Sequence, residues 1–113
     1  MESETLFAGV AVADFQAAQG WYERFFDRPA DVVAHDTEVM WQKTATGWIY
    51  IVRDPEHAGH SLSAIAVPDI EVAIAALHER GIARGPIEQQ SANTRKAVVV
   101  DPDGNSIGII EAH

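Results

Sequence analysis

The sequence contains FAGVAVADF at residues 7–15 and LSAIAVPDI at residues 62–70, two versions of one segment that lie 55 residues apart. In each version the alternation of side chains is typical of a strand, which leads to an aspartate, Asp14 or Asp69. An aspartate there can begin a helix, because its carboxylate accepts a backbone N–H that the first helical turn leaves unpaired. Apolar side chains then recur at helical spacing in both copies, at Phe15, Ala18, Tyr22 and Phe25 and at Ile70, Ala73, Ile74 and Leu77.

Three shorter extended segments follow each expected helix, and a turn joins the last two of them in each copy. The turns are Thr44–Gly47 and Asp101–Gly104. The segments span about 31–35, 38–43 and 48–53 in the first copy and about 83–89, 95–101 and 105–111 in the second. The sequence therefore predicts an α+β fold in which two β-α-β-β-β modules, about 5–54 and 60–113, form a curved mixed sheet within a single domain, 1–113.

The composition fits an ordinary folded domain of 113 residues, 47% of them hydrophobic and 22% charged. The absence of cysteine excludes disulfides, thiolate metal sites and cysteine nucleophiles. The net charge of −9 argues against a nucleic-acid partner, since such a partner needs a basic surface. No apolar run is long enough to cross a membrane, so no membrane partner is expected. The acidic N-terminus is unlike a signal peptide, and a cytoplasmic location is expected.

The first strand of each module has one face of small side chains. The bulkier face carries Val10 and Val12 in the first copy and is suited to packing beneath a helix. The opposite faces carry Phe7, Gly9 and Ala11 and Leu62, Ala64 and Ala66. Two interpretations are open: small residues leave space for a cavity, or they allow close packing of one sheet on another.

The repeat, the V-x-D start of each helix, Trp21-Tyr22 and the closing DPDGN-x-I-x-x-x-E together resemble the vicinal oxygen chelate superfamily. This superfamily includes glyoxalase I, bleomycin-resistance proteins, fosfomycin-resistance proteins and extradiol dioxygenases. The resemblance spans nearly the whole chain. It implies that each module curls its sheet into a half-cup and that a homodimer completes the cup around a small-molecule ligand.

The resemblance also implies where a divalent metal would bind in members that use one, namely to His and Glu side chains of the first and last strands. Glu111 matches the last of these positions. Phe7 and Leu62 stand at the histidine positions and cannot bind an ion. Arg53 or Asp54 stands at the place that corresponds to Glu111, and only Asp54 could serve. The sequence therefore predicts no metal site and no cofactor, with a divalent ion as the alternative.

Glu111 is the candidate catalytic residue. It shares a strand face with Ile107 and Ile109, and at the base of a cup it could act as a general base with a pKa raised by burial. The alternatives are a solvated strand end or an ion pair with Arg53 or Lys96. His60, two residues before Leu62, would join Glu111 if a metal were bound.

Aromatic side chains complete the expected site. Trp41 in one strand, with Trp48 and Tyr50 on a face of its hairpin partner, could line one side of the cup or belong to the core or a dimer interface. The sequence thus predicts a metal-independent protein that binds an apolar or aromatic ligand. The expected ligand-binding residues are Phe7, Trp41, Trp48, Tyr50, His60 and Leu62. The alternative is a metal-dependent lyase, isomerase or dioxygenase that uses Glu111 and His60.

Overall fold

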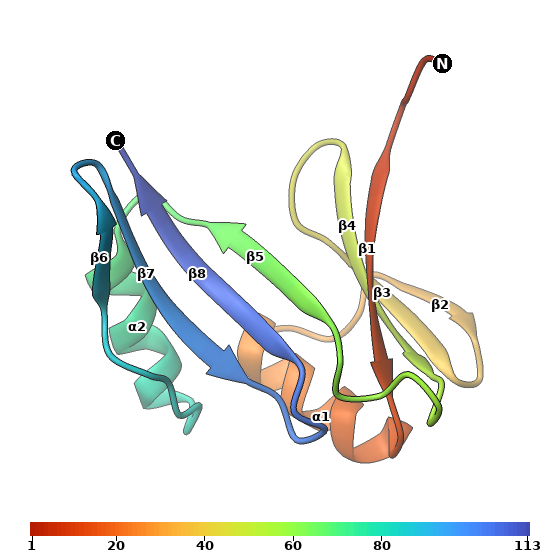
Figure 1. Cartoon of the computed structure of the whole chain (residues 1–113). Helices are drawn as coiled ribbons and strands as arrows, with labels where there is room; N and C mark the ends of the chain where they lie inside the picture. The colour runs from red at the N-terminus through yellow and green to blue at the C-terminus, as the bar shows by residue number, and fades with distance from the viewer.

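Each repeat folds into one sheet with one helix, as Figure 1 shows for the computed structural model, which describes residues 1–113. The first module contains β1 (Leu6–Val12), α1 (Phe15–Phe26), β2 (Val32–His35), β3 (Glu38–Gln42) and β4 (Gly47–Arg53). The second contains β5 (Leu62–Ala66), α2 (Ile70–Glu79), β6 (Glu88–Ser91), β7 (Thr94–Val100) and β8 (Ser106–Ala112). The predicted pair of β-α-β-β-β modules is confirmed.

The two sheets have the same topology. Their strand orders are β1-β4-β3-β2 and β5-β8-β7-β6. The first and last strands of each module pair in parallel, and the other neighbours pair antiparallel, so both sheets are mixed. β1 and β5 therefore each keep one edge without a strand partner.

The two helices begin at the expected aspartates. The Asp14 carboxylate accepts the Ala17 N–H at 3.1 Å. The Asp69 carboxylate accepts the N–H groups of Glu71 and Val72 at 3.0 and 3.2 Å. Each cap satisfies donors that a helix leaves unpaired in its first turn. Gly81, with a φ of 75°, follows α2 in the left-handed region that ends many helices.

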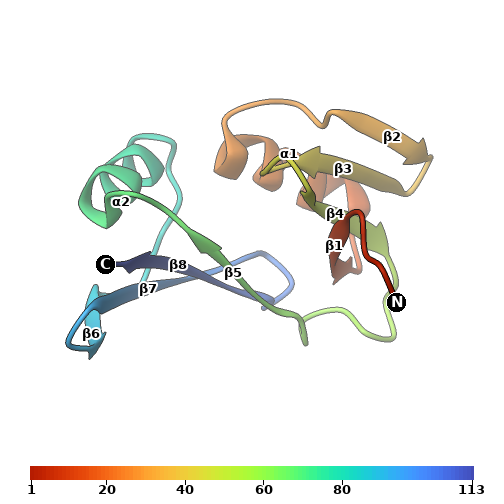
Figure 2. The same cartoon turned by 90° about the horizontal axis from the view of Figure 1, so that it is seen from above.

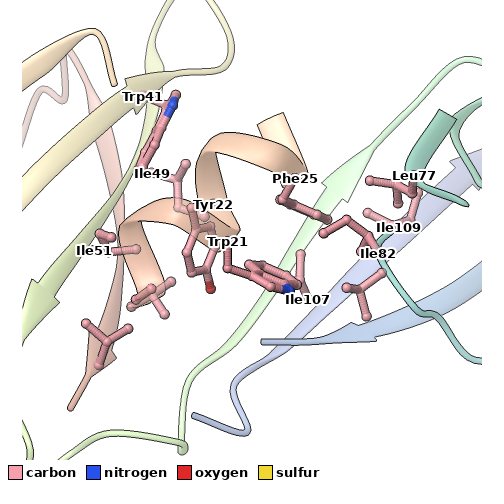
Figure 3. Packing of buried hydrophobic residues seen from close by; sticks show 14 of the residues in the cluster. Trp21, Tyr22, Phe25, Trp41, Ile49, Ile51, Leu77, Ile82, Ile107 and Ile109 are labelled. Atoms are coloured by element: carbon pink, nitrogen blue, oxygen red, sulfur yellow. The ribbon is translucent and has the colours of Figure 1, made fainter. Parts of the chain in front are cut away.

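One core serves both modules. Figure 2 shows the two sheets meeting at an angle, with α1 in the angle between them. Tyr22 of α1 lies near Ile49 and Ile51 of the first sheet, whereas Phe25 points toward Leu77 and Ile109 of the second module (Figure 3). These side chains belong to a single cluster of 18 buried residues. The helix-facing sides of both sheets are thus turned inward, and the other two sides lie on the outside.

A buried polar network joins the modules at the DPDGN segment. The Tyr22 hydroxyl donates to the Asp101 carboxylate at 2.8 Å, and the Asn105 side-chain amide donates to the Ala11 carbonyl at 2.8 Å. The Ser61 N–H donates to the Asn105 side-chain oxygen at 2.9 Å. Burial, together with Asp101, raises the pKa of Tyr22 well above its ordinary value. The motif therefore forms a joint between modules as well as a turn.

Neither helix combines the length and the apolar character that crossing a membrane requires.

Candidate functional site

The outer side of the first sheet carries an aromatic surface. Register places Phe7 beside Trp48 and Gly9 beside Tyr50, and Val10 and Val12 of the same strand point to the buried side. The Phe7 and Trp48 rings are stacked with centroids 6.3 Å apart, and 49% of Phe7 is exposed. We call this surface, made of Phe7, Gly9, Trp48 and Tyr50, the open face of module one.

The contact between Gly9 and Tyr50 explains why a glycine is required at position 9. A methyl group on Gly9 would lie 2.5 Å from the hydroxyl oxygen of Tyr50, so the Tyr50 ring lies directly across the β1 backbone. Within one chain, Gly9 therefore makes room for the Tyr50 side chain and not for a second sheet. Glycine leaves room for an aromatic ring that forms part of an exposed wall.

The outer side of the second sheet is aliphatic, with one cation. We call the surface made of Leu62, Ala64, Lys96, Val98 and Gly108 the open face of module two. Leu62 is 87% exposed, and the Lys96 side chain crosses Gly108 so closely that a methyl group there would lie 2.7 Å from its Cε. All five residues line a shallow pocket of about 270 Å³.

Both open faces leave apolar side chains in solvent. Phe7, Leu62 and Val98 are all exposed, although the helix-facing sides of the same strands are well buried. Contiguous exposed apolar surface marks an interaction site for a ligand or another chain. Because the two open faces lie on the outside of the molecule, a single chain forms two half-cups and no closed cup.

Trp41 corrects one expectation. The sequence placed it with Trp48 and Tyr50, but register sets Trp41 opposite Ile49, on the buried side of the sheet. Trp41 is 0% exposed, and its indole N–H donates to the Arg28 carbonyl at 3.1 Å. Its ring packs against Tyr22 and Phe26 of α1, with centroids 6.2 and 5.1 Å away. Trp41 is a core residue because its pairing with Ile49 puts it on the face of the sheet that α1 covers.

Glu111 does lie on one face with Ile107 and Ile109, but that face is turned inward. Its carboxylate accepts the Ile70 N–H at 2.9 Å, at the N-terminus of α2, and the Arg95 guanidinium at 2.9 Å. These contacts, the Ile70 hydrogen bond first, lower the pKa of Glu111 to about 2. Burial alone was expected to raise the pKa, and the hydrogen bonds outweigh it.

The surroundings of Glu111 are those of a helix cap. An anion beside the first N–H groups of a helix is stabilised by the helix dipole and by the hydrogen bond itself. The partner is Arg95, which lies opposite Glu111 in register, and neither Arg53 nor Lys96. His113 also lies against the carboxylate, at 2.8 Å. A catalytic role for Glu111 stays a prediction, and its carboxylate does not face either open face.

The expected metal ligands do not come together. Phe7 and Leu62 lie on the open faces without a donor atom, and Glu111 points to the opposite side of its sheet. His60 is exposed in the β4–β5 connection and makes no side-chain hydrogen bond. No cluster of three or more His, Asp or Glu side chains could hold an ion. The donor set does not fit a divalent metal site, and we derive no chemistry through one.

Some residues of the open faces were not identified from the sequence, namely Lys96, Val98 and Gly108. The signal that could have found them is strand parity. Ile107, Ile109 and Glu111 share one face of β8, so Gly108 must lie on the other. Knowing which face is covered by the helix then assigns the site.

Comparison with known structures supports the fold and the family. A glyoxalase/bleomycin resistance protein from Catenulispora acidiphila is 38% identical, with a TM-score of 0.91 over 98% of this chain and 100% of that chain. TnmS3, an antibiotic binding protein from a Streptomyces species, is 24% identical, with a TM-score of 0.79 over 99% and 98%. A bleomycin-binding protein complexed with bleomycin is 17% identical, with a TM-score of 0.80 over 98% and 100%. No protein-family model and no curated protein sequence matches the chain.

Proposed function

The chain belongs to the glyoxalase/bleomycin-resistance family, and from this premise we propose that it binds an apolar or aromatic small molecule without a metal ion. The observation that carries the proposal is the open face of module one, where Phe7 and half-buried Trp48 stack at the surface and the end of the Tyr50 side chain lies over Gly9. Aromatic walls of this kind give a flat ligand a large contact area at a low cost in conformational entropy. The Tyr50 hydroxyl adds a polar group that can orient the ligand.

A homodimer is part of this proposal. Each chain presents two half-cups on its outside, and β1 and β5 each have an edge without a strand partner. Placing β1 of one copy beside β5 of a second copy would bring an aromatic open face opposite an aliphatic one. That arrangement would cover exposed Phe7 and Leu62 and would satisfy the free strand edges, which otherwise invite uncontrolled pairing.

The two open faces would then have different tasks. Phe7, Trp48 and Tyr50 would form the wall that stacks on the ligand, and the surface around Leu62 and Val98 would close the opposite side. Lys96 is the cation of the second face and would contact a polar or anionic group of the ligand. Antibiotic-like molecules are the first ligands to test, because two proteins with this fold are described as binding antibiotics.

Calorimetric titration with bleomycin and with 2-naphthol tests the proposal. We expect saturable binding of at least one of them, weakened more than tenfold in a Trp48→Ala variant. Val72→Ala, at an exposed apolar position on α2, is the control and should bind as the unchanged protein does. Binding that Trp48→Ala leaves intact would contradict the assignment of the aromatic wall.

The same titration distinguishes the metal-independent proposal from the enzyme alternative. We expect EDTA to leave the affinity unchanged, since no donor set holds an ion near the open faces. Loss of binding in EDTA, restored by Mn²⁺ or Zn²⁺, would instead support the metal-dependent alternative. Sedimentation equilibrium of the same samples measures whether the chain is a dimer.

A further inference from the structure

The cations of this acidic chain are unevenly distributed. The net charge is −9, and only eight Lys and Arg residues are present. Four of the eight gather around the C-terminal end of α1: Arg24, Arg28 and Arg80 line one surface hollow together with Glu23 and Asp27, and Lys43 is close enough for Arg28 and Arg80 to lower its pKa. Part of this charge compensates the carbonyl end of α1, because the Arg80 guanidinium donates to the carbonyls of Arg24 and Phe25 at 2.5 and 2.9 Å.

An apolar cavity opens beside these cations, between α1 and α2. Its volume is about 150 Å³. Apolar side chains form most of its wall, including Phe25 and Phe26 of α1, Leu77 of α2, and Ile65 and Ile109 of the second sheet. Figure 3 shows Phe25 pointing toward Leu77 and Ile109 across this region. Ile65 and Ile109 are on the helix-facing side of their sheet, and the cavity adjoins a second pocket that shares Lys43 and Ile65 and extends to Trp48 and Ala64.

The polar groups of the cavity are all positive. Lys43 and Arg80 are its only charged lining residues, and no carboxylate lines it. Arg80 is held in place by the two carbonyl groups of α1. A cavity with apolar walls and a wholly cationic rim is complementary to a molecule with an apolar body and a negative end.

Lys43, at the rim of the cavity, has no counterion. Its Nζ lies 4.5 Å from the centroid of the Phe26 ring, and it makes no ion pair and no side-chain hydrogen bond. Partial burial first, and then the charge of Arg28, lower the pKa of Lys43, whereas the charge of Asp31 raises it. An anion at this position would relieve both effects, because it would pair with the ammonium group and oppose the neighbouring guanidinium groups.

We propose that the cavity between α1 and α2 binds a small amphipathic carboxylate, with its apolar part against Phe26, Leu77 and Ile109 and its carboxylate at Lys43. The size of the cavity sets the class of ligand. A cavity of about 150 Å³ holds a single benzene-sized group. Aromatic acids of one ring and alkanoic acids of about six carbons therefore match the cavity in size. The site does not depend on the ligand proposed for the open faces.

Titration of ¹⁵N-labelled protein with benzoate, hexanoate and benzyl alcohol tests this site. We expect both acids to shift the amide signals of α1 and α2 around Phe26 and Leu77. We expect benzyl alcohol, which is a neutral molecule of nearly the same shape, to bind at least about tenfold more weakly than benzoate. Equal binding of benzyl alcohol and benzoate, or shifts confined to the open faces, would overturn the proposal.

Arg84, an exposed arginine that lines neither the cavity nor an open face, offers a control. Lys43→Met keeps the aliphatic stem and should weaken benzoate binding about tenfold, whereas Arg84→Met removes one positive charge elsewhere on the surface and should leave it unchanged. Equal losses in both variants would mean a general charge effect and would overturn the proposal. Ala76→Leu, which fills the cavity without a change of charge, should abolish the binding. Unimpaired binding in that variant would also overturn it.

Discussion

The two modules have the same scaffold and different outer surfaces. Asp14 and Asp69 begin the two helices in the same way, and Gly9 and Ala64 occupy the same place in the first strands. Register then makes Tyr50 and Gly108 equivalent, because Tyr50 lies beside Gly9 and Gly108 lies beside Ala64. One position is therefore an aromatic ring on the first open face and a bare backbone on the second.

The same register makes Arg53 the equivalent of Glu111, because each lies three residues after the pair just compared, Tyr50 and Gly108. Glu111 caps α2, whereas Arg53 has no hydrogen bond to α1. The comparison teaches that the repeat is kept at the apolar positions between sheet and helix, where Ile49 and Ile51 match Ile107 and Ile109, and is lost at the end of the strand and on the outer surfaces. A buried position tolerates few changes, since packing must stay dense. The outer surfaces are free to differ, and the difference between them gives the proposed cup one aromatic and one aliphatic side.

The strongest test of this comparison uses two tryptophans of the first sheet. Trp41 faces the core and Trp48 faces outward. We expect Trp41→Ala to lower the free energy of unfolding by about 3–5 kcal/mol, because it leaves a large cavity. We expect Trp48→Ala to lower it by less than about 1 kcal/mol and to act mainly on ligand binding. Urea denaturation measures both, and similar losses in the two variants would contradict the assignment of the faces.

The two tryptophans also show what the sequence could and could not predict. The repeat, the helix caps and the turn after β7 could be predicted, because each depends on residues close together in the chain. The placement of Trp41 could not, because it depends on the pairing of β3 with β4, which a shift of one residue reverses.

Glu111 illustrates a second limit of the sequence. Parity correctly grouped it with Ile107 and Ile109, but parity does not say which face of a sheet a helix will cover. The partners of its carboxylate, Ile70 and Arg95, come from two other elements. The aromatic wall was predicted in part, since Phe7, Trp48 and Tyr50 do lie together but Trp41 is buried elsewhere. The cavity beside Lys43 could not be predicted, because it depends on how α1 packs against the second module.

The second largest loss of stability is expected from a change in the polar network that joins the modules. Tyr22→Phe removes the hydroxyl that donates to buried Asp101 at 2.8 Å and leaves that carboxylate oxygen with the Asn105 side-chain amide as its remaining donor. We expect a loss of about 1.5–3 kcal/mol, which is typical of a hydrogen bond to a charged group. Thermal denaturation should show one cooperative transition at a lower temperature. A loss as small as that of Trp48→Ala would mean that the joint contributes little to the shared core.

A smaller effect, which disappears in acid, is expected at the position where the modules differ in charge. The pKa of Glu111 is lowered to about 2 in the folded chain from an ordinary value of 4.5. A carboxyl with a depressed pKa stabilises the fold fully above its unfolded value and loses that contribution as the pH falls toward 2. Glu111→Gln should therefore be less stable than the unchanged protein above pH 4.5, and the gap should close between pH 4.5 and 2.

Arg53→Gln is the matched control for that experiment, because it changes the equivalent position of module one. Its stability should follow the unchanged protein in parallel from pH 7 to pH 2, since Arg53 forms no ion pair. Urea denaturation at a series of pH values measures both variants. A gap between Glu111→Gln and the unchanged protein that stays constant down to pH 2 would argue that the Ile70 and Arg95 contacts do not depend on the ionised carboxylate.

The smallest effects concern the glycines of the two open faces. A methyl group on Gly9 would lie 2.5 Å from the Tyr50 ring, which must then move, whereas a methyl group on Gly108 displaces only the end of the flexible Lys96 side chain. We expect Gly9→Ala to cost about 1 kcal/mol and to weaken ligand binding, because the aromatic wall is disturbed. We expect Gly108→Ala to be neutral or to gain up to about 1 kcal/mol, since alanine restricts the unfolded chain more than glycine does. If Gly9→Ala instead bound 2-naphthol as tightly as the unchanged protein, the placement of Tyr50 across β1 would not matter for recognition, and the two open faces would be less different than their side chains suggest.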